Sequence, residues 1–351
     1  MPRKQHFRTM TADSLYLDHA ATTPLLPSAR AAMLEGFAIW ANPSSPHKAG
    51  RAARAALEDA RARIAAALGW DGEVILTSGA SEALVLALTG CNQPLRAVCA
   101  TEHEAVLRYA AGAERLAVDG GGMADPARAA GAGLVAVQQV NNETGVVQPL
   151  YEIGAVVRAA GGLLLADCAQ GAGKLPLPGA DLIAISAHKF GGPVGIGALL
   201  VRDFGMLRPG GGQERGYRGG TENLPGALGM AAALEQGAGW LAEAARLRAR
   251  LEDGIRAGGG TVVAGDSARI ATIGAYGMPG VSSAAQLIRF DAQNIAVSAG
   301  SACSSGSLRT SHVLQAMGVA GANEVIRVSI GRETTEPEID RFLEAWRAIA
   351  A

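Results

Sequence analysis

Short apolar segments alternate with helix-forming segments between residues 51 and 201, and this alternation constrains the fold more than any other feature of the sequence. The apolar segments predict strands at 73–77, 97–101, 115–118, 134–140, 163–166, 181–185 and 196–201. Residues 51–68, 81–89, 104–111 and 151–160 favour helices. Strands that are apolar along their whole length are typical of a parallel sheet covered by helices on both faces. We therefore predict an α/β fold with a mostly parallel central sheet.

The pattern changes in the last third of the chain. Residues 223–256 predict a long helical connection with a break at 237–239. Strands predicted at 261–263, 270–276, 295–298 and 325–330 are interleaved with helices at 284–292, 309–317 and 336–349, which indicates a smaller α+β domain. Because 351 residues exceed what one hydrophobic core usually serves, we predict two domains, a large one (31–244) and a small C-terminal one (245–351). We also predict an N-terminal arm (1–30) that packs with the small domain.

The composition is that of a globular protein, with 49% hydrophobic and 18% charged residues. A formal net charge of −1 gives no general polyanion-binding surface, so we expect no nucleic acid partner. No segment of about 18 residues is both uncharged and apolar throughout, so we expect no membrane span. Arg3, Lys4 and Arg8 are not followed by the apolar segment of a secretory signal, and we expect a cytoplasmic protein.

The four cysteines are Cys91, Cys99, Cys168 and Cys303. No two of them form a CxxC pair, which argues against a zinc knuckle or a thioredoxin-like motif, and we expect no intrinsic metal. Cys99 and Cys168 lie in apolar surroundings and are expected in the core. Cys303 lies in the small, polar sequence Ser-Ala-Cys-Ser-Ser-Gly, which suits an exposed loop. It is either a structural thiol or a nucleophile.

Lys189 follows the predicted strand at 181–185 and is flanked by small residues and glycines. Most lysines are simply exposed to solvent, but glycines here would let the backbone approach a ligand closely. A lysine amine desolvated in such a place can form a Schiff base with an aldehyde. Our hypothesis is that Lys189 holds pyridoxal 5'-phosphate (PLP).

Other polar residues follow neighbouring strands. Ser81 lies at the start of the predicted helix 81–89, where it is either a helix cap or part of an anion site. His103 follows the strand at 97–101; it is either structural or able to stack on a ring or carry a proton. In sheets of this kind, ligands bind beyond the carboxyl ends of the strands.

The next two strands end in the same way. Asn142 ends the strand at 134–140 and belongs either to a polar turn or to a binding site. Asp167 and Gln170 follow the strand at 163–166. Asp167 is either a helix cap or a carboxylate that pairs with a protonated pyridine nitrogen. Each signal is weak alone, but together they predict one site at the carboxyl edge of the sheet.

In this combination the chain resembles the cysteine desulfurases of the NifS/IscS type, which belong to aminotransferase class V. The resemblance extends from Tyr16 to the C-terminal helix. It rests on YLDHAATTP at 16–24, NPSSPH at 42–47, Glu102-His103, NNE at 141–143, DCAQ at 167–170, SAHK at 186–189, RGGTEN at 218–223, GSACSSG at 300–306 and RVSIGR at 327–332. It implies the fold of a fold-type I PLP-dependent transferase, with the large domain binding PLP and the small domain carrying the Cys303 loop.

The resemblance also implies roles for individual residues. Lys189 would form the Schiff base, Asp167 would pair with the pyridine nitrogen, Gln170 would bond the ring hydroxyl and His103 would stack over the ring. The phosphate would be held by Ala80, Ser81, Ser186, His188 and, from a second subunit, Thr221, which implies a homodimer. Asn142 would contact the cofactor and, with Arg327, bind the substrate carboxylate. The family usually has Thr at the position of Ser81; the hydroxyl is kept.

The implied reaction takes sulfur from L-cysteine. L-cysteine would displace Lys189, and the freed lysine with His103 would move the Cα proton. The Cys303 thiolate would then attack the substrate sulfur, leaving L-alanine and a persulfide for a sulfur-acceptor or iron–sulfur scaffold protein, where Cys303 would transiently contact a nascent cluster. The alternatives are a selenocysteine lyase, another class V aminotransferase, or a PLP-binding partner protein without turnover.

Overall fold

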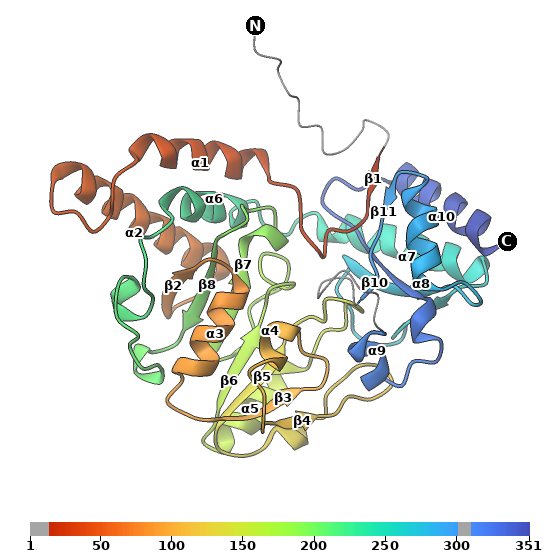
Figure 1. Ribbon diagram of the computed structural model, residues 1–351, viewed down its shortest axis with the longest axis horizontal. Helices are drawn as coiled ribbons and strands as arrows, with labels where there is room; N and C mark the ends of the chain where they lie inside the picture. The colour runs from red at the N-terminus through yellow and green to blue at the C-terminus, as the bar shows by residue number, and fades with distance from the viewer. Residues whose placement is uncertain (1–13, 301–309) are drawn as a thin grey trace, which may run out of the picture.

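The computed structural model describes residues 14–300 and 310–351. Within these residues, a seven-stranded sheet of order β2-β8-β7-β6-β5-β3-β4 forms the centre of the larger part of the molecule (Figure 1). Its strands are β2 (Glu73–Thr77), β3 (Leu95–Cys99), β4 (Glu114–Leu116), β5 (Leu134–Gln138), β6 (Leu163–Asp167), β7 (Leu182–Ser186) and β8 (Gly197–Val201). β8 runs antiparallel to β2 and β7, and the other neighbours are parallel. The predicted α/β fold with a mostly parallel sheet is confirmed.

Helices cover both faces of this sheet, which explains why its strands are apolar throughout. Along β6, Leu164 and Ala166 pack into one core cluster, whereas Leu165 packs into another on the opposite face. Successive side chains of a strand point to opposite faces, so each strand supplies both clusters. The first cluster includes α2 (Lys48–Leu68), α5 (Leu150–Ala159) and α6 (Leu224–Leu234), and the second includes α3 (Ala80–Gly90) and α4 (Glu104–Leu107). α1 (Pro27–Ile39) packs on the outside of α6.

The smaller part is built on the antiparallel sheet β12-β10-β9. Its elements are α7 (Leu241–Ala257), β9 (Thr261–Val262), β10 (Ile273–Gly277), α8 (Ser283–Asp291), β11 (Ile295–Ala296), α9 (His312–Ala316), β12 (Val325–Ser329) and α10 (Glu336–Ala350). β1 (Leu15–Tyr16) pairs with β11, and Leu15 and Leu17 enter the same core as Phe342 and Trp346. The proposed boundary at 244/245 falls in the first turn of α7, and the division into domains stays a prediction.

Several element bounds differ from the sequence-based predictions. The predicted break at 237–239 is confirmed, because α6 ends at Leu234 and α7 begins at Leu241. The helix predicted at 104–111 ends at Leu107, and Gly112 follows with a φ of +82° that a helix does not accommodate. α1 was not predicted. Among the helices of the described residues, none is long and apolar enough to cross a membrane.

Candidate functional site

A cavity of about 430 Å³ opens at the carboxyl edge of the large sheet, and Arg327 from the small sheet also lines it. The parallel strands β3, β5, β6 and β7 all end at this edge, so the polar residues that follow them meet there. The predicted site residues that line the cavity are Ala80, Ser81, His103, Asn142, Asp167, Gln170, Ser186, His188, Lys189 and Arg327. Thr221 is exposed and does not line it, and Cys303 lies outside the described residues.

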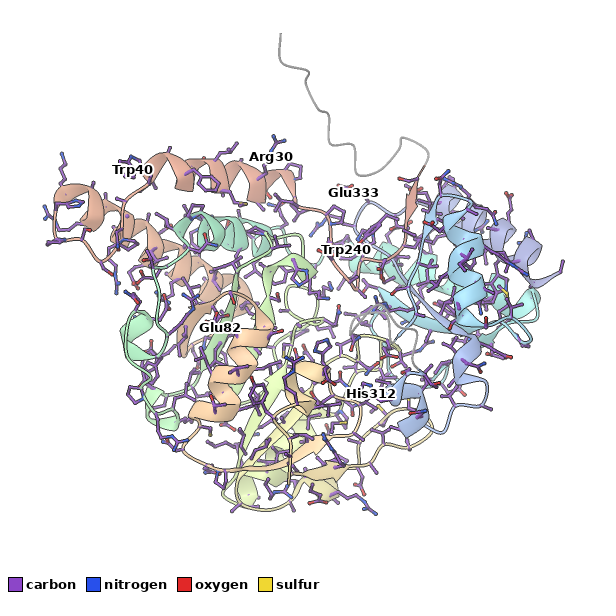
Figure 2. The ribbon with its side chains drawn as sticks, in the orientation of Figure 1. Arg30, Trp40, Glu82, Trp240, His312 and Glu333 are labelled. Carbon is purple, nitrogen blue, oxygen red and sulfur yellow. The ribbon has the colours of Figure 1, made fainter. Side chains whose placement is uncertain are left out.

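One end of the cavity is formed by the start of α3. Figure 2 labels Glu82, which lies in the first turn of this helix and lines the cavity. Gly79 precedes the helix with a φ of +154°, and a Cβ added at Gly197 would lie 2.6 Å from the Gly79 Cα. The turn therefore depends on glycine at both positions. Free N–H groups and the positive end of the helix dipole favour an anion such as a phosphate there, beside the Ser186 hydroxyl.

Asp167 and Gln170 each present a polar group that a ligand could pair with: within residues 14–300 and 310–351, no cation lies within ion-pair distance of the Asp167 carboxylate, and Gln170 Oε1 accepts no hydrogen bond. The Asp167 carboxyl is buried at the end of β6, and this burial raises its pKa, although the Ala169 N–H donates to Oδ1 at 2.9 Å. A cation placed against it would keep it ionised. Gln170 donates from Nε2 to the Ala20 carbonyl at 2.8 Å, while its buried Oε1 has no hydrogen-bond partner among the described residues.

His103 begins α4 as its N-cap residue. Its Nδ1 accepts the Ala105 N–H at 3.1 Å, which assigns the ring proton of the neutral imidazole to Nε2. Burial lowers the pKa of His103, and the charge of Lys189 also lowers it, whereas Asp167 raises it. A neutral imidazole at the cavity wall can stack on an aromatic ring or carry a proton.

Lys189 lies in the short 3₁₀ turn Ala187–Lys189 that follows β7. Its ammonium donates to the carbonyls of Ala20 and Ala21 at 2.6 and 2.8 Å. These carbonyls belong to the N-terminal segment after β1, so the arm fixes the position of the amine. The same segment holds His188, whose Nδ1 lies 3.1 Å from the Thr22 hydroxyl.

Arg327 is buried on β12, and its guanidinium is held from two sides. Nη2 donates to the Asp18 carboxylate at 2.7 Å and Nη1 donates to the Asn142 carbonyl at 3.0 Å, while the buried Nε has no partner among the described residues. Only 2% of the arginine side chain is exposed, against 20% for Asp18. A fixed, buried cation at the cavity wall is suited to a carboxylate ligand.

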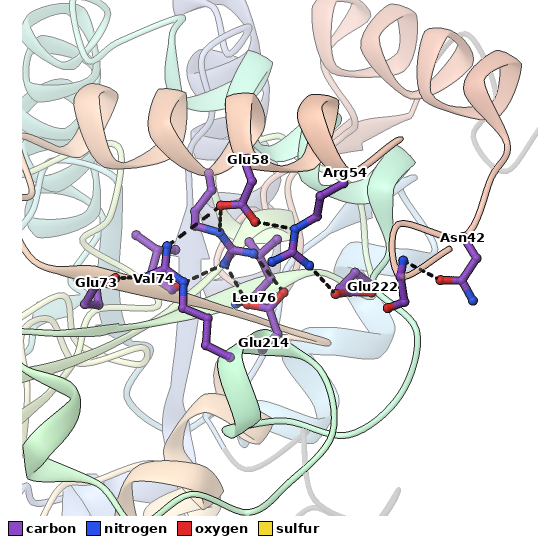
Figure 3. Close-up of polar contacts among 11 residues, drawn as sticks. Asn42, Arg54, Glu58, Glu73, Val74, Leu76, Glu214 and Glu222 are labelled. Atoms are coloured by element: carbon purple, nitrogen blue, oxygen red, sulfur yellow. Dashed lines mark hydrogen bonds and ion pairs between the residues drawn. The ribbon is translucent and has the colours of Figure 1, made fainter. Parts of the chain in front are cut away.

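The segment that carries Thr221 is anchored to the large sheet by ion pairs. The buried Glu214 carboxylate accepts hydrogen bonds from Arg61 Nη1 and Nη2 at 2.7 and 3.1 Å, and from the Leu76 N–H at 2.8 Å (Figure 3). Further along, Arg218 donates to Glu82 at 2.9 Å. These contacts hold the chain near the start of α3 while Thr221 remains exposed.

The residues present fit PLP. The α3 turn provides an anion cradle that a Cβ would fill, the Asp167 carboxyl requires a cation such as a pyridinium nitrogen, and the orphaned Gln170 oxygen can accept from a hydroxyl. The Lys189 amine lies in the same cavity. This fold with this site defines a fold-type I PLP-dependent enzyme.

Comparisons with known proteins agree with this class. The model of the family Aminotransferase class-V matches residues 15–342. The chain is 39% identical to "Cysteine desulfurase IscS" of Anaeromyxobacter sp. (strain Fw109-5), covering 94% of this chain and 90% of that protein. Its structure is similar to that of a NifS-like protein from Rickettsia africae ESF-5, with a TM-score of 0.86, 30% identity and coverage of 96% and 99%. It is also similar to SspA in complex with cysteine, with a TM-score of 0.78, 30% identity and coverage of 92% and 100%.

The chain belongs to the class-V aminotransferase family, and its cofactor is PLP. Sequence reasoning assigned no role to Asp18, Ala20 or Gly197. Asp18 and Ala20 lie inside the motif at 16–24, so a signal for them was present. Gly197 has no local signal, because its importance arises only from its place opposite Thr77 and Ser186 in the sheet.

Proposed function

We propose that the protein is a cysteine desulfurase, which removes sulfur from L-cysteine and releases L-alanine. The observation that carries this proposal is the meeting of the Lys189 amine, the Asp167 carboxyl and the Arg327 guanidinium in one cavity. When bound, PLP withdraws electrons from the Cα of an amino acid. The relatives named as cysteine desulfurases, and the relative with cysteine bound, support L-cysteine as the amino acid.

The residues of the chain divide the work of binding and proton transfer. Arg327, with Asn142 beside it, binds the substrate carboxylate, because its charge is buried and its orientation fixed. The freed Lys189 amine accepts the Cα proton, and the neighbouring carbonyls of the N-terminal arm hold it in reach. His103, neutral at pH 7 because burial lowers its pKa, stacks over the ring and assists the proton transfer. Ala80, Ser81, Ser186 and His188 hold the phosphate.

Cys303 is the proposed nucleophile, on the evidence of the sequence. The other cysteines, Cys91, Cys99 and Cys168, are buried, and this burial raises the pKa of the Cys99 thiol to about 11 and that of the Cys168 thiol well above its ordinary value. Such thiols are poor nucleophiles. The thiolate of Cys303 would take the substrate sulfur as a persulfide and pass it to a sulfur-acceptor or iron–sulfur scaffold protein in the cytoplasm.

The described residues on either side of 301–309 lie close to the cavity. A side chain at Gly300 would collide with the Glu143 carboxylate, and the Ser311 hydroxyl donates to the same carboxylate at 2.5 Å. Glu143 is adjacent to Asn142 in the chain. His312 also contacts the Glu102 carbonyl at 2.9 Å. These contacts support a sulfur acceptor at Cys303.

The active form is proposed to be a homodimer in which Thr221 of each subunit completes the phosphate site of the other. α1 exposes Leu34, Phe37 and, at its end, Trp40, with exposed fractions of 61, 60 and 85%. Figure 2 shows Trp40 at the outer edge of the molecule. Apolar side chains gathered on one helix surface are typical of an interface. Sedimentation of the PLP-loaded protein tests this, and a single species with the mass of one chain would contradict it.

The function is tested by incubating the PLP-loaded protein with L-cysteine and a thiol, then measuring L-alanine and sulfide. We expect both products in equal amounts from the wild type. Cys303→Ala should bind PLP and release neither product, whereas the matched control Cys91→Ala, remote from the cavity, should remain active. Full activity of Cys303→Ala would refute its role as acceptor. Parallel reactions with L-selenocysteine decide whether selenium is preferred, which would make the protein a selenocysteine lyase.

A further inference from the structure

The chain has four lysines, and two of them meet behind the site. Lys174 is buried, and its ammonium donates to the Gln170 carbonyl at 3.2 Å. A small inner cavity of about 30 Å³ is lined by Lys174 and Lys189 together, and also by His19, Thr272 and Arg332. That volume holds about two water molecules. The two lysines therefore line the same small cavity.

This inner cavity has no acid to balance two ammonium charges. Its lining includes no Asp or Glu from the described part of the chain, and within 14–300 and 310–351 no carboxylate forms an ion pair with Lys174. Desolvation lowers the pKa of Lys174 to about 7, and the charge of Lys189 lowers it as well. Lys189 differs because Asp167 acts on it from the outer cavity.

The histidines and arginines that line the two cavities add no negative charge. Burial lowers the pKa values of His19 and His188 to about 4, so both imidazoles are neutral at pH 7. The pKa of His103 is also lowered by burial. Arg332 lines the inner cavity and Arg327 the outer one, and both add positive charge. Arg332 therefore opposes a second proton on the two lysines, whereas Asp167 favours one on Lys189 and the Arg327 charge is paired with Asp18.

We propose that Lys174 and Lys189 form an amine pair that holds one proton at neutral pH, with Lys174 as a positioning residue that sets the protonation state of Lys189. A neighbouring cationic group is one of the ways by which proteins obtain a neutral, reactive lysine. Removal of Lys174 would let Lys189 keep its own proton to a higher pH. Substitution by arginine would instead leave a permanent charge next to Lys189.

The pair also explains how one lysine can both accept and donate a proton, if the proposed desulfurase function holds. While Lys174 carries the shared proton, the freed Lys189 amine is neutral and can take the Cα proton. Its nitrogen lone pair forms the new N–H bond, and the electrons of the Cα–H bond stay with the substrate. The pair then holds two protons. Repulsion within the inner cavity favours the release of one of them, so Lys189 gives up the proton as readily as it accepted it.

Lysine titration by NMR tests the pair without any measurement of activity. Full-length protein labelled with carbon-13 at lysine Cε has few signals to assign, because only Lys4 and Lys48 accompany the pair. In the cofactor-free wild type, the chemical shifts of Lys174 and Lys189, followed against pH, should together report the loss of one proton near pH 7. We call this change the shared step. The exposed Lys48, which lines neither cavity, serves as the internal control.

Two variants separate the pair from a structural role. In Lys174→Met, the step near pH 7 should vanish and Lys189 should titrate at least one pH unit higher, a tenfold change in its acid dissociation constant. In Lys174→Arg, the Lys189 signal by itself should show the loss of one proton near pH 7. The proposal would be overturned if Lys174 and Lys189 of the wild type both stayed protonated up to pH 9. It would also be overturned if Lys189 titrated identically in the wild type and both variants. The pH at which the absorbance of the PLP-loaded protein changes should shift in the same order.

The test distinguishes this inference from the proposed function. A wild type that shows the shared step near pH 7 but forms no alanine and sulfide would refute the desulfurase function and leave the amine pair standing. A wild type that is active without the shared step would refute the pair alone. If Lys174→Met does not fold, Lys174→Arg decides by itself whether Lys189 carries the step.

Discussion

Replacing Glu214 by Gln should destabilise the protein far more than the same replacement at Glu235. Both glutamates form two hydrogen bonds to an arginine of α2. Glu214 binds Arg61 at 2.7 and 3.1 Å, and Glu235 binds Arg63 at 2.7 and 2.8 Å. The two pairs differ in burial, since the exposed side-chain fractions are 8 and 1% for Arg61 and Glu214, but 34 and 40% for Arg63 and Glu235.

The expected magnitudes follow from that difference. Glu214→Gln leaves the Arg61 charge buried without its partner, a change that costs about 3–5 kcal/mol in other proteins. Glu58, at 3.1 Å from Arg61, retains part of the compensation, so the lower end of this range is expected. Glu235→Gln removes an exposed pair that is screened by solvent, and should cost about 0.2–1 kcal/mol.

The assay is denaturant unfolding of the PLP-loaded variants followed by circular dichroism, with the free energy of unfolding obtained from the midpoint and slope. Glu214→Gln should shift the midpoint at least three times as far as Glu235→Gln. Equal shifts would mean that burial does not control the strength of the Arg61 pair, and would refute the reasoning.

Two further predictions concern the site. Gly197→Ala should weaken PLP binding at least tenfold, because the added Cβ would lie 2.6 Å from the Gly79 Cα. The control Gly239→Ala has open space around its added Cβ and should bind PLP as the wild type does. Equal PLP affinities of the two variants in a titration would contradict this prediction. Acid should destabilise the fold between pH 6.5 and 4: the pKa values of His19 and His188 are about 4 in the folded chain and about 6.5 when unfolded, so the unfolded state binds more protons in this window. His19→Gln should reduce that dependence in denaturant midpoints measured from pH 7 to 4, and a wild-type midpoint that does not fall would contradict it.

The strands of the large sheet could be predicted from sequence because burial on both faces makes them apolar throughout. α1 escaped prediction for the opposite reason. Leu34, Phe37 and Trp40 are exposed on the single chain, so the helix lacks the one-sided apolar stripe that marks a helix packed on a core. Its sequence is better suited to a helix between two protein surfaces.

By itself, the sequence determined which chemical groups follow the strands, and because parallel strands end at one edge, it also determined that these groups meet. Only the tertiary structure decided the pairings between distant residues. It places Asp18 on Arg327, 309 positions away, and Lys174 beside Lys189 in one cavity. The reason is physical: periodicity along a chain reports the burial of each segment, whereas the partner and charge environment of a side chain depend on how whole segments pack together.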